Sequence, residues 1–417
     1  MLNIERLHQS IIWHYENWIL YPFYRFTIGN RVRSMRVKDK INVLFIITEV
    51  ASWKTRELYE TMLAHPRFNP ILGISMSLET PTAKSNLVDF LQEKHYEYVD
   101  LDVNSNSLGV DGKIDIVFYQ KPYEFCYKPQ IWFKQHLNCI FCQVAYAFNS
   151  IEATWSTNLP LYECVWQQYF ENKLTANPKR KAMLPDGGKQ VVITGLPIQD
   201  QLMIPKEHFI DPWKKQAKPK KRIIYAPHHT IGDMHLKGLA ISSFLENGES
   251  ILELMHKYSD EVQWAFKPHP LLYQKLVSLW GQEKTDKYYN EWKTAENSQF
   301  ENGEYDALFK YSDAMIHDCS SFTIEYHYTN NPVMFLTRQK GEESNRNAFA
   351  QKAFDLHYKG YTKDDIEKFI QNVIDGVDPM KEERKRFYDD YLIPPHCKTA
   401  CENIINAILG EAEYKDL

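Results

Sequence analysis

The sequence lacks any apolar run that approaches the ~20 residues a membrane-spanning helix needs. It also lacks the pattern of a secretory leader, because Glu5, Arg6 and Glu16 interrupt the apolar residues of the first twenty positions. A strong charge excess is missing too, since 49 Lys and Arg residues oppose 54 Asp and Glu residues, a formal net charge of −5. So small a net charge gives no global field to recruit nucleic acid. These absences predict a soluble or peripheral protein without a nucleic-acid partner.

Paired cysteines are scarce as well. The seven cysteines are scattered over 417 residues and form no disulfide framework, so we expect a reducing compartment and a cytoplasmic protein. Cys139 and Cys142 form a C-x-x-C pair, but no second pair has zinc-ribbon spacing. Because the surrounding "NCIFCQVAY" has the apolar pattern of a strand, we interpret the two thiols as strand residues rather than as a metal or redox site.

Aromatic residues, in contrast, are abundant at 14% of the chain, and residues 1–40 combine them with basic residues. The aromatic members are Trp13, Trp18, Tyr21, Phe23, Tyr24 and Phe26, and the basic ones that follow are Arg25, Arg31, Arg33, Arg36, Lys38 and Lys40. This composition is typical of a helix that lies in a membrane surface. A helix packed on the protein body explains it equally well, so both interpretations stay open.

The rest of the chain alternates between short apolar runs and helical patterns. The runs "INVLFIIT" (Ile41–Thr48), "NPILGISMS" (Asn69–Ser77), "IDIVFYQ" (Ile114–Gln120), "NCIFCQVAY" (Asn138–Tyr146) and "QVVITGLP" (Gln190–Pro197) read as buried strands. The polar "PWKKQAKPKK" then reads as a linker, after which the alternation restarts. The pattern predicts an α/β protein with two Rossmann-like domains facing across a cleft, residues 41–210 and residues 211–417.

Polar side chains follow three predicted strands of the second domain. The loops read "YAPHHT" (His228, His229 and Thr230), "FKPHP" (Lys267 and His269) and "HDCSS" (Asp318, Ser320 and Ser321). Each loop alone is explained by a packing histidine, a strand-ending proline or an ordinary helix cap. Because ligands bind beyond the carboxyl ends of parallel strands, however, the three loops together predict one site. Its lysine, imidazoles, hydroxyls and helix start suit a diphosphate.

These loops resemble motifs of the CDP-glycerol glycerophosphotransferase family, the polyol-phosphate transferases of teichoic acid and capsule synthesis. The matching segments are "TGLPIQDQL", "YAPHHT", "FKPHP" and "YDALFKYSDAMIHDCSSFTIEYHYTNNPVMFL", from about Val191 to Leu336. The resemblance implies a GT-B-like fold whose second domain binds a CDP-linked polyol donor. The acceptor would be a hydroxyl of a glycan or of a lipid-linked chain, and the enzyme would work as a peripheral protein at the inner face of the cell membrane.

We group Lys267, Asp318, Ser320, Ser321, Thr230 and Gly195 as the donor-binding residues. Carried over by position, the resemblance implies that Ser320 and Ser321 hold donor phosphate at the helix start and that Asp318 fixes their loop. It sets His269 beside the diphosphate, where it stabilises charge or moves a proton. Two features depart from the family's pattern. The first domain lacks the expected H-G-T-P histidine, since the corresponding strand end reads "VAYAFNS", and "YAP" continues with His228 and His229 instead of Thr-Trp-Arg.

Phosphoryl transfer needs positioning, charge neutralisation and a base near neutral pH, which favours imidazole. We therefore expect His228 or His229 to replace the missing first-domain histidine as the base. A divalent cation is compatible with this chemistry, but no carboxylate cluster requires one. Two alternatives stay open, a nucleotide-sugar glycosyltransferase of the same fold and a non-catalytic relative that only binds nucleotide or polymer.

Overall fold

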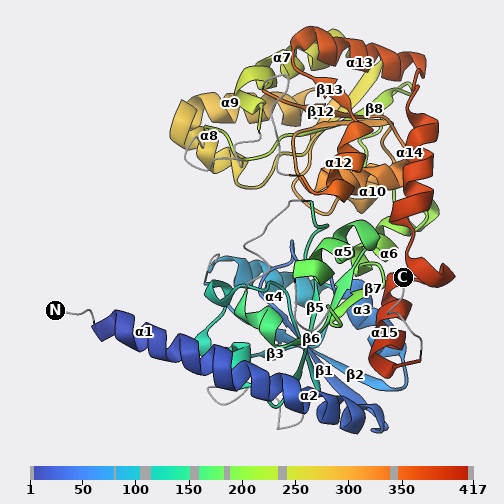
Figure 1. Ribbon diagram of the computed structural model, residues 1–417. Coiled ribbons are helices and arrows are strands. Elements are labelled where there is room, and N and C mark those ends of the chain that lie inside the picture. The colour runs from blue at the N-terminus through green and yellow to red at the C-terminus, as the bar shows by residue number, and fades with distance from the viewer. Residues whose placement is uncertain are drawn as a thin grey trace. The chain divides into compact units, whose positions relative to one another are not determined.

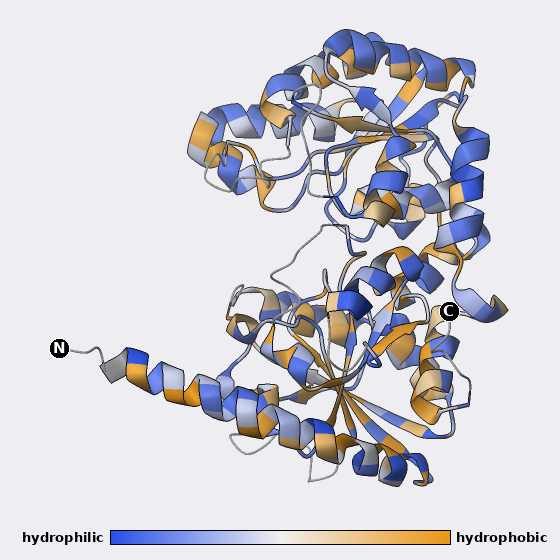
Figure 2. Ribbon diagram, in the orientation of Figure 1, coloured by the Kyte–Doolittle hydropathy of each residue, from blue (hydrophilic) through white to orange (hydrophobic). Residues whose placement is uncertain are grey.

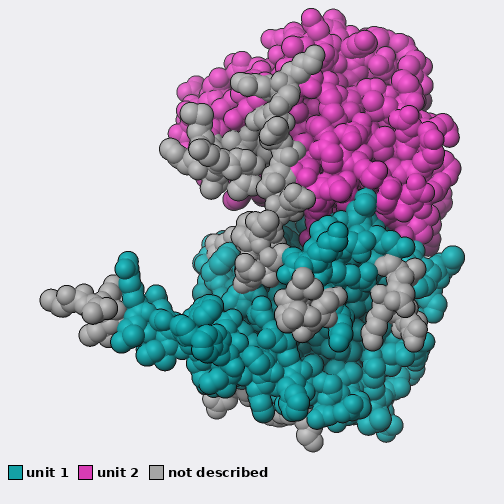
Figure 3. Space-filling view, viewed as in Figure 1, with its two compact units in different colours: residues 1–147, 153–200, 394–417 teal, residues 148–152, 201–393 magenta. Residues whose placement is uncertain are grey.

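The computed structural model describes residues 4–78, 81–103, 114–150, 159–182, 188–232, 242–338 and 346–411. The chain divides into two compact units, drawn in separate colours in Figure 3. Unit 1 comprises residues 1–147, 153–200 and 394–417, and unit 2 comprises residues 148–152 and 201–393. Each unit contains one parallel β-sheet with helices (Figure 1), which confirms the predicted α/β class with two Rossmann-like domains.

Unit 1 is built on a seven-stranded sheet in the order β3-β2-β1-β4-β5-β6-β7. Its central strands are buried almost throughout, as expected for a parallel sheet covered on both faces. The strands are β1 (Ile41–Ile47), β2 (Phe68–Ile74), β3 (Val99–Asp100), β4 (Ile116–Tyr119), β5 (Ile140–Val144), β6 (Val165–Phe170) and β7 (Val191–Ile193). The α-helices are α1 (Ile4–Tyr15), α2 (Tyr21–Arg36), α3 (Arg56–Ala64), α4 (Ala83–Glu93), α5 (Lys173–Ala182), α6 (Pro197–Met203), which crosses into unit 2, and α15 (Ala400–Leu409).

Unit 2 is built on a six-stranded parallel sheet in the order β10-β9-β8-β11-β12-β13. Its larger core packs Trp264, Phe266 and Trp292 against aliphatic residues of the sheet and helices. The strands are β8 (Lys221–Ala226), β9 (Val262–Phe266), β10 (Ser298–Phe300), β11 (Ala314–His317), β12 (Val333–Leu336) and β13 (Tyr358–Gly360). The α-helices are α7 (Phe244–Lys257), α8 (Leu272–Trp280), α9 (Gln282–Thr294), α10 (Asp306–Lys310), α11 (Phe322–Glu325), α12 (Ala348–Asp355), α13 (Lys363–Asp375) and α14 (Lys381–Phe387).

The end of the chain differs from the expected domain boundaries. We expected residues 211–417 to form one domain, but residues 394–417 belong to unit 1. The carboxylate of Asp200 accepts the backbone N–H groups of Ala400 and Cys401 at 2.7 and 2.8 Å, and so holds the start of α15. At the other end of that helix, the Arg36 guanidinium donates to the carbonyl of Ile408 at 2.9 Å. These long-range contacts fix α15 in unit 1.

The N-terminal forty residues divide into two parts with different surroundings. Tyr21 and Tyr24 of α2 are buried, and the Tyr24 hydroxyl donates to the carbonyl of Cys139 at 3.0 Å. This half is therefore packed on the body of unit 1. Apolar residues of α1 and of the π-helical turn η1 (Glu16–Leu20) are instead exposed, including Trp18 at 70%. Figure 2 shows hydrophobic stretches along the ribbon of α1. None of the helices in the described part of the chain is both long and apolar enough to cross a membrane.

The C-x-x-C pair lies in and beside β5 in the core of unit 1. Both thiols are free and buried, and burial raises the pKa of Cys139 to about 11 and of Cys142 to about 12. Thiols with such pKa values are poor nucleophiles and poor metal ligands near neutral pH. Cys142 is a residue of β5, as interpreted, whereas Cys139 lies one position before the strand.

Candidate active site

Three polar loops of unit 2 meet because of the strand order. The strands β9, β8 and β11 are neighbours in the sheet, and all three run parallel. Their carboxyl ends therefore lie along one edge, where the loops after Ala226, Phe266 and His317 begin. The backbone N–H of His269 donates to the carbonyl of Pro227 at 2.9 Å, which joins the first two loops directly.

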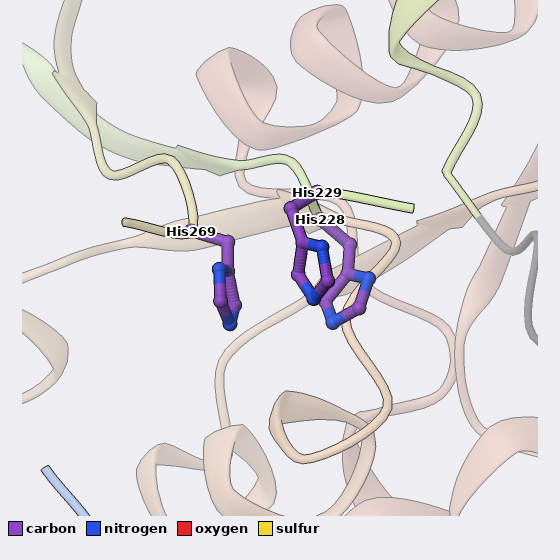
Figure 4. A group of neighbouring side chains, drawn as sticks. All are labelled: His228, His229 and His269. Atoms are coloured by element: carbon purple, nitrogen blue, oxygen red, sulfur yellow. The ribbon is translucent and has the colours of Figure 1, made fainter. Parts of the chain in front are cut away.

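The imidazoles of His228, His229 and His269 form a compact cluster at this edge (Figure 4). The ring centroids are 4.4 Å apart for His228 and His229, 4.1 Å for His229 and His269, and 5.0 Å for His228 and His269. One nitrogen from each ring lies within 4.8 Å of the other two, and all three side chains are half-buried. Among the described residues, this is the only group of three that has the spacing of metal ligands.

Hydrogen bonds orient two of these rings. The backbone N–H of Leu271 donates to Nδ1 of His269 at 3.2 Å, so the neutral ring carries its proton on Nε2. Nδ1 of His228 lies 3.0 Å from the Thr230 hydroxyl. Burial, followed by neighbouring positive charge, lowers the pKa of His228 to about 3 and of His269 to about 4. Both imidazoles are therefore neutral near pH 7.

Asp318 connects the loops of the site through hydrogen bonds to its carboxylate. Its side chain is 1% exposed, and Oδ1 accepts the backbone N–H of His228 at 2.5 Å. Oδ2 accepts from the Ser242 hydroxyl at 3.0 Å and from the Ser243 backbone N–H at 2.8 Å. Burial raises the pKa of Asp318 to about 6, and these hydrogen bonds oppose that rise. Asp318 is thus a positioning residue that fixes the loop.

Lys267, the lysine of the "FKPHP" loop, is buried, with 8% of its surface exposed. Its ammonium Nζ donates to the carbonyl of Gly303 at 2.7 Å and lies over the Tyr305 ring at 5.4 Å from the centroid. Thr230 is also buried, with its hydroxyl beside His228. Thr230 thus contacts the cluster, whereas Lys267 contacts Gly303 and Tyr305, and the donor-binding role of both residues stays a prediction.

The "HDCSS" loop leads into a helix start, as expected, but the helix is short. The helix α11 has only four residues, and its N-cap Ser321 makes no side-chain capping bond. Ser320 instead has its hydroxyl 2.9 Å from that of Ser150. The four residues of α11 continue directly into the 3₁₀ turn η9 (Tyr326–Thr329), so the helical dipole here is short, and the anion site at this helix start stays a prediction. The two half-buried hydroxyls remain as ligand groups.

Gly195 lies in unit 1, whereas the histidine cluster lies in unit 2, and its assignment to donor binding stays a prediction. Its φ is +82°, and an added Cβ would come within 2.9 Å of the Ala400 side chain and 3.0 Å of the Pro394 side chain. The glycine of the T-G-x-P motif is thus explained by a left-handed turn that packs tightly against the start of α15.

Sequence reasoning missed the residues that reach the site from distant segments. Ser150 was assigned to a first-domain strand end but belongs to unit 2. The Asn347 side-chain amide donates to the carbonyl of Asn149 at 2.5 Å, and the Asn347 backbone N–H donates to the carbonyl of Ser150 at 3.1 Å. Ser242 and Ser243 reach Asp318 from the start of α7. No local pattern marks these partners, since each contact spans 75 or more residues.

The family of the chain follows from a sequence profile. The CDP-Glycerol:Poly(glycerophosphate) glycerophosphotransferase profile matches residues 180–409, more than half of the chain and all three loops of the histidine cluster. The chain belongs to this family. It is accordingly a CDP-glycerol glycerophosphotransferase-like enzyme, a transferase for polyol phosphate with a CDP-linked donor, as the sequence predicted. No curated protein shows significant similarity to this glycerophosphotransferase-like chain.

Solved structures share the fold of this glycerophosphotransferase family member. A variant of the wall teichoic acid polymerase TagF is 16% identical, with a TM-score of 0.53 over 99% of this chain and 98% of that one. The UDP-GlcNAc 2-epimerase from Neisseria meningitidis, bound to UDP-GlcNAc, is 13% identical, with a TM-score of 0.57 over 89% and 100%. S. aureus MnaA with UDP is 14% identical, with a TM-score of 0.52 over 88% and 96%. At these identities the matches support the fold alone.

Proposed function

We propose that this enzyme transfers glycerol phosphate or ribitol phosphate from a CDP-linked donor to a hydroxyl of a cell-surface glycan or lipid-linked acceptor. The acceptor oxygen attacks the donor's distal phosphorus, the bond from that phosphorus to the bridging oxygen breaks, and CMP leaves. The observation that carries the proposal is the meeting of the β8, β9 and β11 loops within the segment that matches the family profile.

His269 is the group we assign to the diphosphate. Because Nδ1 accepts the Leu271 N–H, the Nε2–H of the neutral ring is a hydrogen-bond donor for a phosphate oxygen. The flanking Pro268 and Pro270 restrict the backbone of its loop. Ser320 and Ser321 add hydroxyl groups for donor oxygens. The assignment of the general base to His228 or His229 stays a prediction.

A cytoplasmic protein that works on a lipid-linked acceptor must reach the membrane surface, and α1 with η1 is the element we propose for this contact. Leu7, Ile11, Trp18 and Ile19 are between 59% and 70% exposed. Spacings of three, four and seven residues align such side chains along a helix, so the arm offers an apolar stripe to the headgroup boundary.

Three of the basic residues behind this stripe have partners within unit 1. Arg25 forms an ion pair with Glu163, and Lys38 forms one with Asp115 at 2.5 Å. Arg36 binds carbonyls of α15. These charges already have partners inside unit 1, so we propose that apolar insertion rather than charge supplies most of the membrane affinity.

Turnover with defined donors tests the function. Purified enzyme with a membrane acceptor fraction should release CMP from CDP-glycerol or CDP-ribitol and none from a control lacking acceptor. Release of UDP from UDP-sugars instead would identify a glycosyltransferase, and nucleotide binding without turnover of any donor would identify a binding protein. His269→Ala should lower turnover by about 10²-fold, in the range for a lost charge-stabilising group. His256→Ala, at an exposed histidine of α7, is the matched control.

A further inference from the structure

The histidine cluster has the donor atoms of a metal site. One nitrogen from each of His228, His229 and His269 lies within 4.8 Å of the others, and no carboxylate or thiol of the described residues joins the group. Figure 4 shows the three rings extending in the same direction from their two loops, with a nitrogen at each tip. Three nitrogen donors on one side of an ion leave its remaining positions open, which is the arrangement of catalytic rather than structural zinc sites.

We propose that His228, His229 and His269 bind one divalent transition-metal ion, of which Zn²⁺ is the expected occupant. Imidazole nitrogen suits Zn²⁺, Co²⁺, Ni²⁺ and Cu²⁺, whereas Mg²⁺ and Ca²⁺ prefer oxygen ligands. A cluster made of nitrogen donors alone therefore discriminates against the two abundant oxygen-seeking cations. The ion would lie among the ring nitrogens of His228, His229 and His269, between the loops that follow β8 and β9.

The backbone around the cluster is held as a metal site requires. The His228 N–H is bound by Asp318, and the His269 N–H by the carbonyl of Pro227. The Thr230 hydroxyl accepts from Nδ1 of His228 when Nε2 binds a metal, which is the outer contact that fixes a ligand's tautomer. Both histidine loops are thus anchored independently of the ion.

Binding requires one local rearrangement. A tetrahedral ion with Zn–N bonds of about 2.0–2.1 Å brings ligand nitrogens to roughly 3.4 Å from one another, so the half-buried rings rotate inward. Coordination through Nε2 of His269 moves that ring's proton to Nδ1 and gives up the hydrogen bond from Leu271, which at 3.2 Å is long. Side-chain rotation suffices, because the loop backbones already lie side by side.

The proposal deepens the proposed function at one point and otherwise stands without it. The Lys267 ammonium is engaged with the carbonyl of Gly303, and the cluster contains no arginine. A divalent ion would add two positive charges for the donor diphosphate, a role that rests on the proposed function. All three histidines would then be metal ligands. The ion would take the place of the His269 Nε2–H toward the phosphate oxygens, and the base would be a group other than His228 or His229.

Metal titration of the full chain tests the site without any donor. After chelator treatment and buffer exchange, Co²⁺ should bind one per chain and give the visible absorption of a nitrogen-ligated ion, and Zn²⁺ should displace it. His229→Ala and His269→Ala should each weaken Co²⁺ binding at least 10-fold, whereas His256→Ala should leave it unchanged. A thousand-fold excess of Mg²⁺ should not displace Co²⁺. Absence of a one-to-one complex, or equal binding by all variants, would overturn the proposal.

Folding and donor binding need separate readouts. Circular dichroism and thermal unfolding of each variant establish that the fold is retained, and His229→Gln and His269→Gln replace any alanine variant that does not fold. CDP-glycerol binding to chelator-treated protein, measured by thermal shift, reports on the donor site alone. Donor binding without metal binding rejects the metal site and leaves the proposed function standing. Metal binding without binding of any CDP-linked donor supports the metal site and rejects the proposed function.

Discussion

The carboxylate of Asp318 and the backbone N–H of His228 are joined by a hydrogen bond of 2.5 Å across the carboxyl ends of β11 and β8. The same carboxylate also accepts hydrogen bonds from the Ser242 hydroxyl and the Ser243 backbone N–H at the start of α7. One buried side chain therefore connects three segments of the chain. The position of His228 in the cluster therefore depends on a residue that lies ninety positions away in the chain.

Asp318→Ala should destabilise the protein by roughly 2–3 kcal/mol, because it leaves buried donors without an acceptor. Asp318→Asn retains one carbonyl oxygen and should cost less. Urea unfolding measures both effects, and turnover should fall with each. Asp375→Ala, at an exposed carboxylate of α13, is the control and should stay within about 0.5 kcal/mol. Equal stability of Asp318→Ala and Asp375→Ala would contradict the positioning role.

Ser321→Ala should weaken donor binding without lowering thermal stability, because the Ser321 side chain makes no capping bond in the fold. Isothermal titration with CDP-glycerol, beside a thermal unfolding scan, separates the two effects. Thr294→Ala, at the end of α9, removes a hydroxyl from an exposed hydrogen bond and serves as control. An unchanged donor affinity would leave Ser321 as a purely structural residue.

Three buried histidines outside the cluster should make the folded protein less stable in acid. Nδ1 of His357 faces the carbonyl of Ala353 at 2.9 Å and must carry a proton, so its Nε2 accepts from Nε2–H of His317 at 3.1 Å. Nε2 of His327 also donates to Ala353, at 2.9 Å. Burial lowers the pKa of His317 and of His327 to about 3 and lowers that of His357 well below its usual range.

Each of these histidines binds a proton more readily in the unfolded chain, where its pKa is about 6.5. Their stabilising effect is therefore complete above pH 6.5 and is lost as pH falls toward 3, with a slope of up to about 1.4 kcal/mol per pH unit for each residue. Urea unfolding between pH 5 and 7 should show this slope, and His357→Phe should reduce it. His256→Ala, at an exposed site, should leave the slope unchanged. A slope that His357→Phe does not reduce would refute the claim that the buried histidines cause it.

The N-terminal arm should carry vesicle binding. A chain beginning at Tyr21 keeps the buried face of α2 and should fold, but it should no longer co-sediment with anionic vesicles that bind the full chain. Moderate salt should reduce binding only slightly, because Arg25, Arg36 and Lys38 have partners in unit 1. The double variant Ile11→Glu, Trp18→Glu should act like the truncation, while Phe125→Glu, at an exposed residue outside the arm, should not. Equal sedimentation of the full and shortened chains would show that the arm does not contribute to vesicle binding.

Gly195→Ala should destabilise unit 1 by more than Gly376→Ala destabilises unit 2. Both glycines have positive φ, +82° and +70°, so both alanine variants strain the backbone by about 1–2 kcal/mol. Only at Gly195 does the new Cβ also meet neighbouring side chains, whereas nothing lies within 4 Å at Gly376. Thermal unfolding compares the two, and equal losses would show that the contact with α15 does not matter.

Much of the fold was determined by the local sequence. Continuous apolar runs such as Ile41–Ile47 form parallel strands because both faces of the strand are buried, and burial leaves no polar position in the pattern. The site loops were found in the same way, since strand direction alone sends their residues to one edge. The strand β6 was missed because Gln167 and Gln168 interrupt its apolar pattern.

Tertiary structure decided what local pattern does not encode. The attachment of α15 to unit 1 depends on Asp200 and Arg36, which are far away in sequence, and no feature of the helix itself specifies that partner. The same holds for Arg25 and Lys38, which form ion pairs with Glu163 and Asp115, carboxylates that lie 138 and 77 positions away in the chain. The sequence by itself determined which residues reach the edge of the second sheet. Only the packing of separate loops decided that three imidazoles lie close enough to share one ligand, because that distance depends on contacts between segments distant in the chain.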